Sequence, residues 1–319
     1  MTELQIATEA FLQALATGLQ VGAIYGLMCV GLAMIFGIMR VINFAQGDFM
    51  MLGMFTALFF FSLLTQALFG SYIGPYVAVA LAAPIMFGVG YLVHMTLVSR
   101  VTGNRTAKLD GEGHYAQLIL TLGISLILQN GAMMLFGPQL VSIRTPLSSR
   151  AIEIGPLWGE WVTVFINQGR GIAAIIAVIV IAGLTMMINR SRLGKSLRAA
   201  ADNPEASTYM GIDVNTAHRV AFALGTMITA VAGGLLATNY PFHPFVGVEF
   251  VIIMYAGVVL GGVGSILGAF WGGMAIGLVQ QLSTLVLPTQ LQNAAIFVVF
   301  LLIVTLRPQG LFGRVSERT

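Results

Sequence analysis

The chain has 319 residues, of which 57% are hydrophobic and only 8% are charged, and its formal net charge is +3. A soluble domain carries about 25% charged residues, so this composition excludes an ordinary soluble protein and indicates a polytopic membrane protein. The basic residues lie in loops between apolar segments, so the positive charge does not indicate nucleic-acid binding. The single cysteine, Cys29, excludes an internal disulfide and suggests no metal site.

Apolar segments recur along the whole chain, and a segment of about 20 residues is enough to span a bilayer. We expect spans near residues 11–39, 49–69, 75–98, 115–136, 172–188, 217–238, 250–263, 266–287 and 293–306. The first segment is long, whereas the seventh and the last are short, so the sequence predicts eight to ten spans. The predicted fold class is all-α: a single transmembrane domain over residues 1–319, built as a helical bundle with possible broken or re-entrant helices.

A polar break separates the first two apolar segments and contains Asn43, Phe44, Gln46, Gly47 and Asp48. A polar break at membrane depth is tolerated only where it lines a cavity or is buried in protein. The helix that starts near Asp48 would then direct its positive end toward a bound carboxylate. The alternative is a turn at the cytoplasmic face with Asp48 as its cap, and the sequence leaves both open.

The fourth predicted span carries a polar residue at every fourth position: Gln117, Thr121, Ser125 and Gln129. This spacing places the four side chains on one helix face. A polar face avoids lipid, so we expect it to turn inward. It then meets either a solute pathway or, as is commoner, a neighbouring helix.

The distribution of Lys and Arg predicts the orientation, because these residues are enriched in cytoplasmic loops. With loop 189–216 inside and nine spans, the N-terminus lies outside and the C-terminus in the cytoplasm. Loop 137–171 is then extracytoplasmic, and its Trp158 and Trp161 suit the membrane interface. The basic residues on the cytoplasmic side are Arg40, Arg100, Arg105, Lys108, Arg190, Arg192, Lys195, Arg198, Arg219, Arg307, Arg314 and Arg318, against Arg144, Arg150 and Arg170 outside.

Loop 189–216 is unusually polar for this chain and has the pattern of a short helix. Asn203 suits an N-cap, Pro204 the first helical position and Gly211 the C-terminus, which predicts a helix over roughly 204–210. One interpretation is a basic flank of a span with an incidental turn, and the other is a knob that docks on a soluble partner. The fragment around Lys195 is not a phosphate-binding loop, because the first glycine of that motif is absent.

Glycines recur in the C-terminal part of the chain, at Gly257, Gly261, Gly262, Gly264, Gly268, Gly272 and Gly277. Close helix packing explains most of them, as it does Gly18, Gly22 and Gly26. We expect a helix break at Gly264 as the counterpart of the 43–48 break, although no residue-level repeat is evident. The preceding segment 239–250 is either a stiff extracytoplasmic surface or a plain turn.

Ionisable residues are almost absent from the predicted spans. His94 and His218 fall near span ends, and Asp48 and Glu249 at segment boundaries. A proton-driven transporter usually keeps titrating groups inside the membrane. The pattern therefore argues against proton coupling and favours either an externally driven pump or a facilitator of neutral solutes.

Three stretches resemble the permeases of branched-chain amino-acid ABC importers, the Liv type. They are GLQVGAIYGLMCVGLAMIFGIMRVINFAQGDFMMLGMF (17–55), LGKSLRAAADNPEASTYMGIDV (193–214) and AGVVLGGVGSILGAFWGG (256–273). They fall in the family's order, and the resemblance covers most of the chain. Segments 56–114 and 137–171 match only in hydropathy and as loops.

The resemblance implies a non-enzymatic permease subunit in a bacterial inner membrane, without a cofactor of its own. It implies four kinds of partner: a homologous second permease, two ATPase subunits that bind ATP and Mg, an extracytoplasmic solute-binding protein and the lipid bilayer. The coupling positions would be Arg198, Asp202, Asn203, Pro204, Glu205 and Gly211. The pathway positions would be those of the 43–48 break and of the polar stripe, together with Gly261, Gly262 and Gly264.

Other readings stay open. Within the resembling family, the solute could be urea, a short amide or an aromatic carboxylate, because first selection belongs to the binding protein. From a different class, the chain could be a stand-alone facilitator or channel for neutral solutes. A third reading is a membrane scaffold without transport.

Overall fold

The computed structural model describes residues 3–102, 112–157, 162–288, 291–307 and 309–312. Within them, six helical stretches are long and apolar enough to cross a membrane, and two shorter apolar helices, Val246–Gly261 and Gln292–Leu306, accompany them. One of the six, Gln46–Val101, turns at Gly70, whose φ of 68° interrupts the helix. Each of the apolar segments predicted from the sequence therefore contains a helix, and the chain is a polytopic helical bundle.

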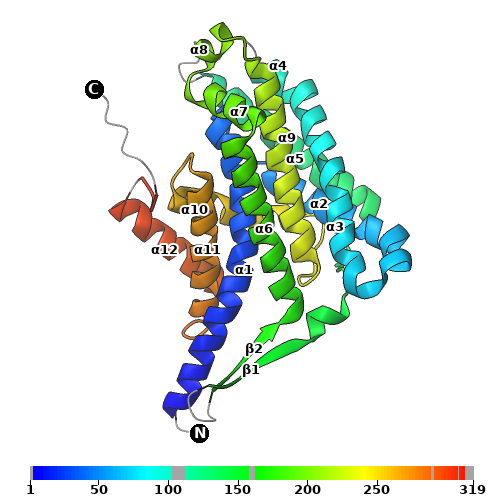
Figure 1. Cartoon of the computed structure of the whole chain (residues 1–319), viewed down its shortest axis with the longest axis vertical. Coiled ribbons are helices and arrows are strands. Elements are labelled where there is room, and N and C mark those ends of the chain that lie inside the picture. The colour runs from blue at the N-terminus through cyan, green and yellow to red at the C-terminus, as the bar shows by residue number, and fades with distance from the viewer. Residues whose placement is uncertain (1–2, 103–111, 158–161, 289–290, 308, 313–319) are drawn as a thin grey trace.

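The elements follow one another in the order shown in Figure 1. The helices are α1 (Glu3–Met39), α2 (Gln46–Phe60), α3 (Gln66–Val93), α4 (Ser99–Thr102), α5 (Glu112–Phe136), α6 (Gln168–Arg190), α7 (Arg192–Asp202), α8 (Pro204–Tyr209), α9 (Val214–Ala237), α10 (Val246–Gly261), α11 (Ile266–Ser283) and α12 (Gln292–Leu306). Two π-helical turns, Phe61–Thr65 and His94–Val98, follow α2 and α3. The strands β1 (Ala151–Leu157) and β2 (Val162–Asn167) form an antiparallel hairpin with Ala151 opposite Asn167.

Helices α1 and α9 form the buried centre of the bundle and run in opposite directions (Figure 1). Gly31 of α1 lies against Thr229 and the backbone of Gly225 in α9, so closely that a methyl group at Gly31 would collide with both. Elsewhere on α1, Tyr25 packs edge-on against Phe250 of α10, with 5.9 Å between ring centroids. Small residues at the crossing let the two backbones approach, which is how helices associate where no hydrophobic drive exists between them.

Each of these two helices begins a group of three helices, and the two groups run in opposite directions. The first is α1, α2 and α3, and the second is α9, α10 and α11. In each group an irregular segment separates the first helix from the second, at 40–45 and at 238–245. Helices α2 and α10 therefore both start inside the bundle, and Gly47 and Gly247 bring their first turns into backbone contact.

The third helix of each group packs on the first helix of the other group. Gly273 of α11 lies against Gly26 of α1, and Gly90 of α3 lies against Thr226 of α9. This exchange is the arrangement of an inverted repeat, which commonly surrounds a binding site near the middle of a transporter. The expected pairing of the 43–48 break with Gly264 was wrong, because the matching break is the segment that precedes α10.

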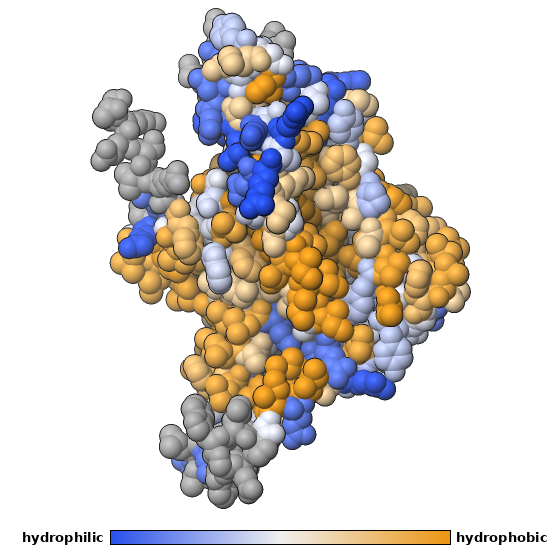
Figure 2. Space-filling view, in the orientation of Figure 1, coloured by the Kyte–Doolittle hydropathy of each residue, from blue (hydrophilic) through white to orange (hydrophobic). Residues whose placement is uncertain are grey.

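The two ends of the bundle differ. α7 and α8 stand at one end, and the start of α1 and the β-hairpin stand at the other (Figure 1). Figure 2 shows an apolar surface over the middle of the molecule and hydrophilic residues gathered around α7 and α8. At the opposite end, the Gln13 side chain clamps α1 to the hairpin, donating to the Phe165 carbonyl and accepting from its amide, both at 2.8 Å.

Both long loops contain structure that the sequence did not predict. The segment 137–171 contains the β-hairpin, and the segment 189–216 contains α7 in addition to the expected short helix. Several residues used to predict the orientation or the interface lie outside the described residues: Arg105, Lys108, Trp158, Trp161, Arg314 and Arg318.

Candidate functional site

The polar break before α2 is buried inside the bundle. Asn43 and Gln46 have no exposed surface, and Asp48 is 2% exposed. Gln46 reaches the middle of α9, where its amide donates to the Gly225 carbonyl at 3.2 Å and to the Thr229 hydroxyl. The interpretation as a turn at the cytoplasmic surface was therefore wrong: the chain folds back from the end of α1 into the bundle before α2 begins.

The helix that follows the break is not capped by a side chain. Its N-cap is Ala45, and no side chain accepts from the first turn. α10 begins in the same way, with Phe245 as an uncapped N-cap of similar backbone geometry. The predicted cap role of Asp48 is wrong, and its carboxylate instead accepts a hydrogen bond of 3.0 Å from Gln129 of α5.

The polar stripe of α5 faces this break. Its residues Gln117, Thr121, Ser125 and Gln129 are between 1% and 9% exposed, whereas Ile119, Leu126 and Ile127 on the outer face are at least 60% exposed. Gln129 bridges Ser125 and Asp48 with two bonds of 3.0 Å, and Thr121 reaches the Ile42 carbonyl at 3.5 Å. Two features that the sequence shows separately thus form one polar cluster, which we call the buried polar cluster.

Asp48 and His94 are buried in the bundle, although the sequence suggested that they lie at span boundaries. Among the described residues no Lys or Arg pairs with Asp48, and neither ring nitrogen of His94 has a hydrogen-bond partner. Phe44 is different: it is 37% exposed and packs against Tyr255 of α10, with 5.5 Å between the ring centroids and the rings tilted.

The glycines of the 256–273 segment form a tight helical hairpin at the other end of the molecule from the β-hairpin. Gly261 of α10 lies against the backbone of Gly268 in α11. The turn between the helices uses Gly262 and Gly264, with φ values of 99° and 89° that disfavour other residues. This turn lies near α7, and Gly264 lines a pocket together with Ile42, whose carbonyl accepts from Thr121 of the buried polar cluster.

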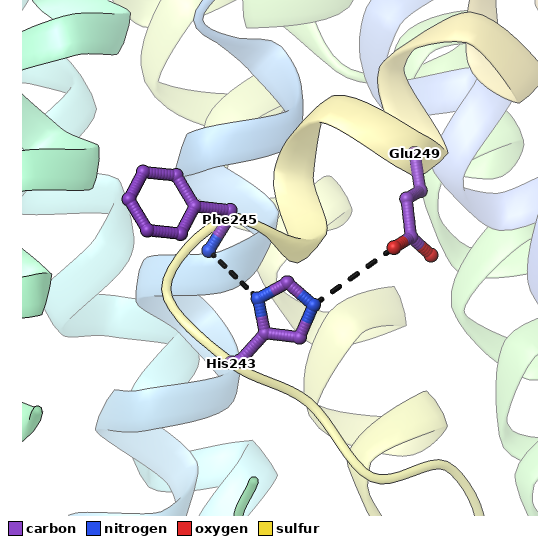
Figure 3. Close-up of polar contacts among 3 residues, drawn as sticks. All are labelled: His243, Phe245 and Glu249. Carbon is purple, nitrogen blue, oxygen red and sulfur yellow. Dashed lines mark hydrogen bonds and ion pairs between the residues drawn. The ribbon is translucent and has the colours of Figure 1, made fainter. Parts of the chain in front are cut away.

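The segment 239–245 before α10 folds into the protein rather than forming a plain surface turn. Phe242 is fully buried and pairs through its backbone with Val141. His243 closes the turn, with Nδ1 accepting from the Phe245 amide at 3.2 Å and Nε2 lying 3.8 Å from a Glu249 carboxylate oxygen (Figure 3).

The polar end of the molecule is organised by α7, which packs back onto the bundle. Ser191 caps it by accepting from the Gly194 amide at 2.9 Å, and Gly194 lies against the backbone of Ile188. This close approach explains the glycine of the fragment that superficially resembled a phosphate-binding loop. α7 carries the candidate coupling residues Arg198 and Asp202, which are exposed.

On one side of α7, a crevice of about 370 Å³ lies between this helix and the bundle. Arg198 and Asp202 line it on one side, and Gly37 of α1 and the turn at Gly264 line it on the other. Arg198 also donates to the Asn189 carbonyl at 3.5 Å. The crevice thus brings α7 next to the end of α1 and the start of α11.

Beyond α7, α8 projects as a short, capped helix. Asn203 accepts from the Ala206 amide at 3.0 Å, Pro204 occupies the first turn, and Gly211 ends the helix with a φ of 80°. These are the roles that capping rules predict. Glu205 is exposed on this helix. After α8, the helix α9 begins with Asp213 as its N-cap. Hydrogen bonds from Thr216 hold the pKa of the Asp213 carboxyl below its usual value.

Sequence reasoning missed two residues at the tip of this element. Tyr209 and Met210 are 89% and 82% exposed, although they are large and apolar and lie at the polar end of the molecule. Exposed apolar residues in a polar setting mark contact sites. The sequence signal for this contact site was the presence of two apolar residues within an otherwise polar loop.

Comparison with known proteins agrees with this architecture. A family model described as the permease component of the branched-chain amino acid transport system matches residues 14–306. The high-affinity branched-chain amino acid transport system permease protein BraD of Pseudomonas aeruginosa is 31% identical over 307 residues, which cover 95% of this chain and 96% of BraD. The corresponding protein LivH of Escherichia coli K12 is 28% identical over 314 residues, with 95% and 96% coverage.

More distant similarity reaches the ribose import permease protein RbsC of Escherichia coli K12, which is 26% identical over 230 residues, covering 68% of this chain and 65% of RbsC. No solved structure matches the chain significantly. The family match runs from the first third of α1 to the end of α12 and includes the buried polar cluster, α7 and α8. The chain belongs to the family of permease components of branched-chain amino acid transport systems.

Proposed function

We propose that this chain is the membrane-spanning subunit of an ATP-driven importer for branched-chain or similarly apolar amino acids. The proposal places it in a bacterial inner membrane, with the α7–α8 end in the cytoplasm and the β-hairpin outside. A second permease, two ATPase subunits that bind ATP and Mg, and an extracytoplasmic binding protein complete the importer. The observation that carries the proposal is α8, a capped helix with an apolar tip that projects from the polar end of a bundle of this family.

α8 is suited to dock on an ATPase subunit. Its exposed Tyr209 and Met210 supply apolar contact area, and Glu205 supplies a charge beside them. The crevice under α7 gives the docked element room to move against the end of α1 and the turn at Gly264. A movement of α8 thereby reaches the end of α1, which leads directly into the 43–48 break that contributes Asp48 to the buried polar cluster.

The buried polar cluster is the proposed selective part of the pathway. It lies beside the meeting point of α2 and α10, and the positive ends of the two helix dipoles favour a negatively charged group there. A solute that passes this point meets helix dipoles and polar side chains instead of hydrocarbon, with Asp48 as the acidic group among them.

The test is co-expression of the chain with its partner subunits, followed by purification through a tag on this chain and measurement of ATP-dependent leucine uptake in proteoliposomes. We expect the double variant Tyr209→Ala, Met210→Ala to lose most of the bound ATPase and to lower uptake at least tenfold. Val286→Ala is the matched control, because Val286 is 86% exposed but stands at the other end of the molecule.

A stand-alone facilitator behaves differently in the same experiment. It would move leucine without ATP, and the α8 double variant would take up leucine at the same rate as the parent chain. Either result would contradict the proposed function.

A further inference from the structure

A small polar pocket opens at the end of the bundle that carries the β-hairpin. Its volume is about 180 Å³, and an apolar protein cavity of about 150 Å³ already holds a benzene molecule. Its polar wall consists of Tyr25, Arg170, Asn239, Tyr240, Gln280, Gln281 and Gln292. This concentration of amides around one guanidinium is unusual in so apolar a chain, and it is separate from the buried polar cluster.

Arg170 is the only charged residue that lines the described pocket, and it is half-buried. The one ion pair found among the described residues joins His243 and Glu249, so Arg170 has no carboxylate partner there. It lies in the first turn of α6, where the helix dipole disfavours a cation. The Arg170 cation therefore does not stabilise the helix, and its guanidinium is available to a ligand.

The backbone around Arg170 is held firmly. Asn167 accepts from the Arg170 amide at 3.0 Å and donates to the Ser148 carbonyl at 2.7 Å. Gly169 lies against the Asn239 side chain, which joins the start of α6 to the segment before α10. The fixed start of α6 thus places Arg170 at the pocket wall, and a guanidinium binds a carboxylate through two parallel hydrogen bonds.

A negative group stands at the edge of the same pocket. Glu249 lies next to Tyr240, a residue of the pocket wall, and Figure 3 shows His243 directed at its carboxylate. The Glu249 side chain is 52% exposed and so retains free acceptor capacity. Arg170 and Glu249 both lie close enough to the Tyr25 hydroxyl to act on it electrostatically.

The remaining wall is apolar. Val21, Ile24 and Leu236 line the pocket, and Phe250 backs it, with its ring centroid 5.9 Å from that of Tyr25 and 5.7 Å from that of Tyr240. An aliphatic side chain placed there would be removed from water. The pocket thus presents a cation and an apolar surface to one small molecule, with the carboxylate of Glu249 next to the Tyr240 wall.

We propose that this pocket is an outer receiving site for an apolar amino acid, which binds with its carboxylate on Arg170, its ammonium toward Glu249 and its side chain against Val21 and Ile24. The inference rests on the proposed function, because the outer end must be the side on which solute arrives. A molecule that lacks the carboxylate loses the Arg170 contact, and a molecule that lacks the ammonium keeps it.

The experiment uses the purified complex of the full chain and a leucine analogue with a diazirine in its side chain as a photoreactive probe at millimolar concentration. We expect covalent label on peptides that contain Val21–Tyr25 or Gln280–Gln281, and excess leucine should remove it. Excess leucinamide, which has no carboxylate, should compete at least tenfold less well. Arg170→Gln should reduce the label at least tenfold, and Arg170→Lys, which keeps the charge and the fold of the helix, should reduce it less.

Arg150→Gln is the control, because Arg150 is an exposed cation near the same end that packs over the Tyr72 ring outside the pocket. Absence of label from these peptides, or equal label in the monodisperse Arg170→Gln variant, would overturn the proposed site. Leucine uptake measured in parallel separates the two proposals. ATP-dependent uptake without Arg170-dependent labelling rejects the pocket alone, and the absence of ATP-dependent uptake in the parent chain rejects the proposed function.

Discussion

Gln46 joins three elements through one buried side chain. It accepts from the Asn43 amide at 2.9 Å and donates to α9 at Gly225 and Thr229. Because it has no exposed surface, water cannot replace any of these bonds. A polar residue in this position is costly unless every partner is present, so the bonds specify how the break sits against α9.

We expect Gln46→Leu to lower the free energy of unfolding by about 2 kcal/mol, because it leaves the buried Asn43 amide and Thr229 hydroxyl without their partner. Thermal unfolding in mild detergent measures the change. Gln66→Leu is the control, since Gln66 is exposed and its replacement should shift the midpoint little. Equal midpoints for the two variants would show that the Gln46 network does not stabilise the fold.

At the scale of elements, the contact between α2 and α10 depends on the absence of side chains. A methyl group on Gly47 would meet the carbonyl of Gly247, and the same holds in reverse. The two helix starts can approach only because both positions are glycine. This contact sets how closely the two halves of the inverted repeat meet.

Gly47→Ala should therefore destabilise the protein by about 1–3 kcal/mol through overpacking and reduce leucine uptake. Gly88→Ala on α3 is the matched control, because open space surrounds Gly88 and alanine is favoured over glycine in a helix by about 1 kcal/mol. The two variants should shift the unfolding midpoint in opposite directions. A Gly47→Ala protein as stable and active as the parent would disprove the close contact.

At the scale of the whole molecule, α8 and the short helix at Pro146–Ser149 stand at opposite ends of the bundle. The lone Cys29 is fully buried, so the parent chain offers no exposed thiol among its described residues. In this background, the labelling of a single introduced cysteine shows which end of the molecule faces the cytoplasm.

We expect a membrane-impermeant maleimide added to intact spheroplasts to label Ser149→Cys but not Thr208→Cys. Both residues are exposed, so lysis should make Thr208→Cys reactive and leave the parent chain unlabelled. The reverse pattern would place α8 outside and would remove the basis for its docking on a cytoplasmic ATPase.

The sequence alone determined the features that depend on neighbours along the chain. Hydropathy located the helical segments because each must satisfy its own backbone in lipid. The cap residues Asn203, Pro204 and Gly211 located α8 because capping is a matter of a few consecutive residues. The stripe on α5 was visible because its period is that of the helix.

Only the tertiary structure decided where these pieces meet. Gln129 and Asp48 are 81 positions apart, and no local pattern indicates that they are partners. The depth of the 43–48 break followed from the way the chain folds back along α9. Its counterpart before α10 shares the backbone geometry of the helix start and one glycine, Gly247 matching Gly47, whereas the neighbouring residues differ. Arg170 likewise looked like one of three basic residues outside, until packing placed it among the amides of α11 and α12. Local propensities act over one or two turns, whereas sites in a bundle are assembled by contacts between helices distant in sequence.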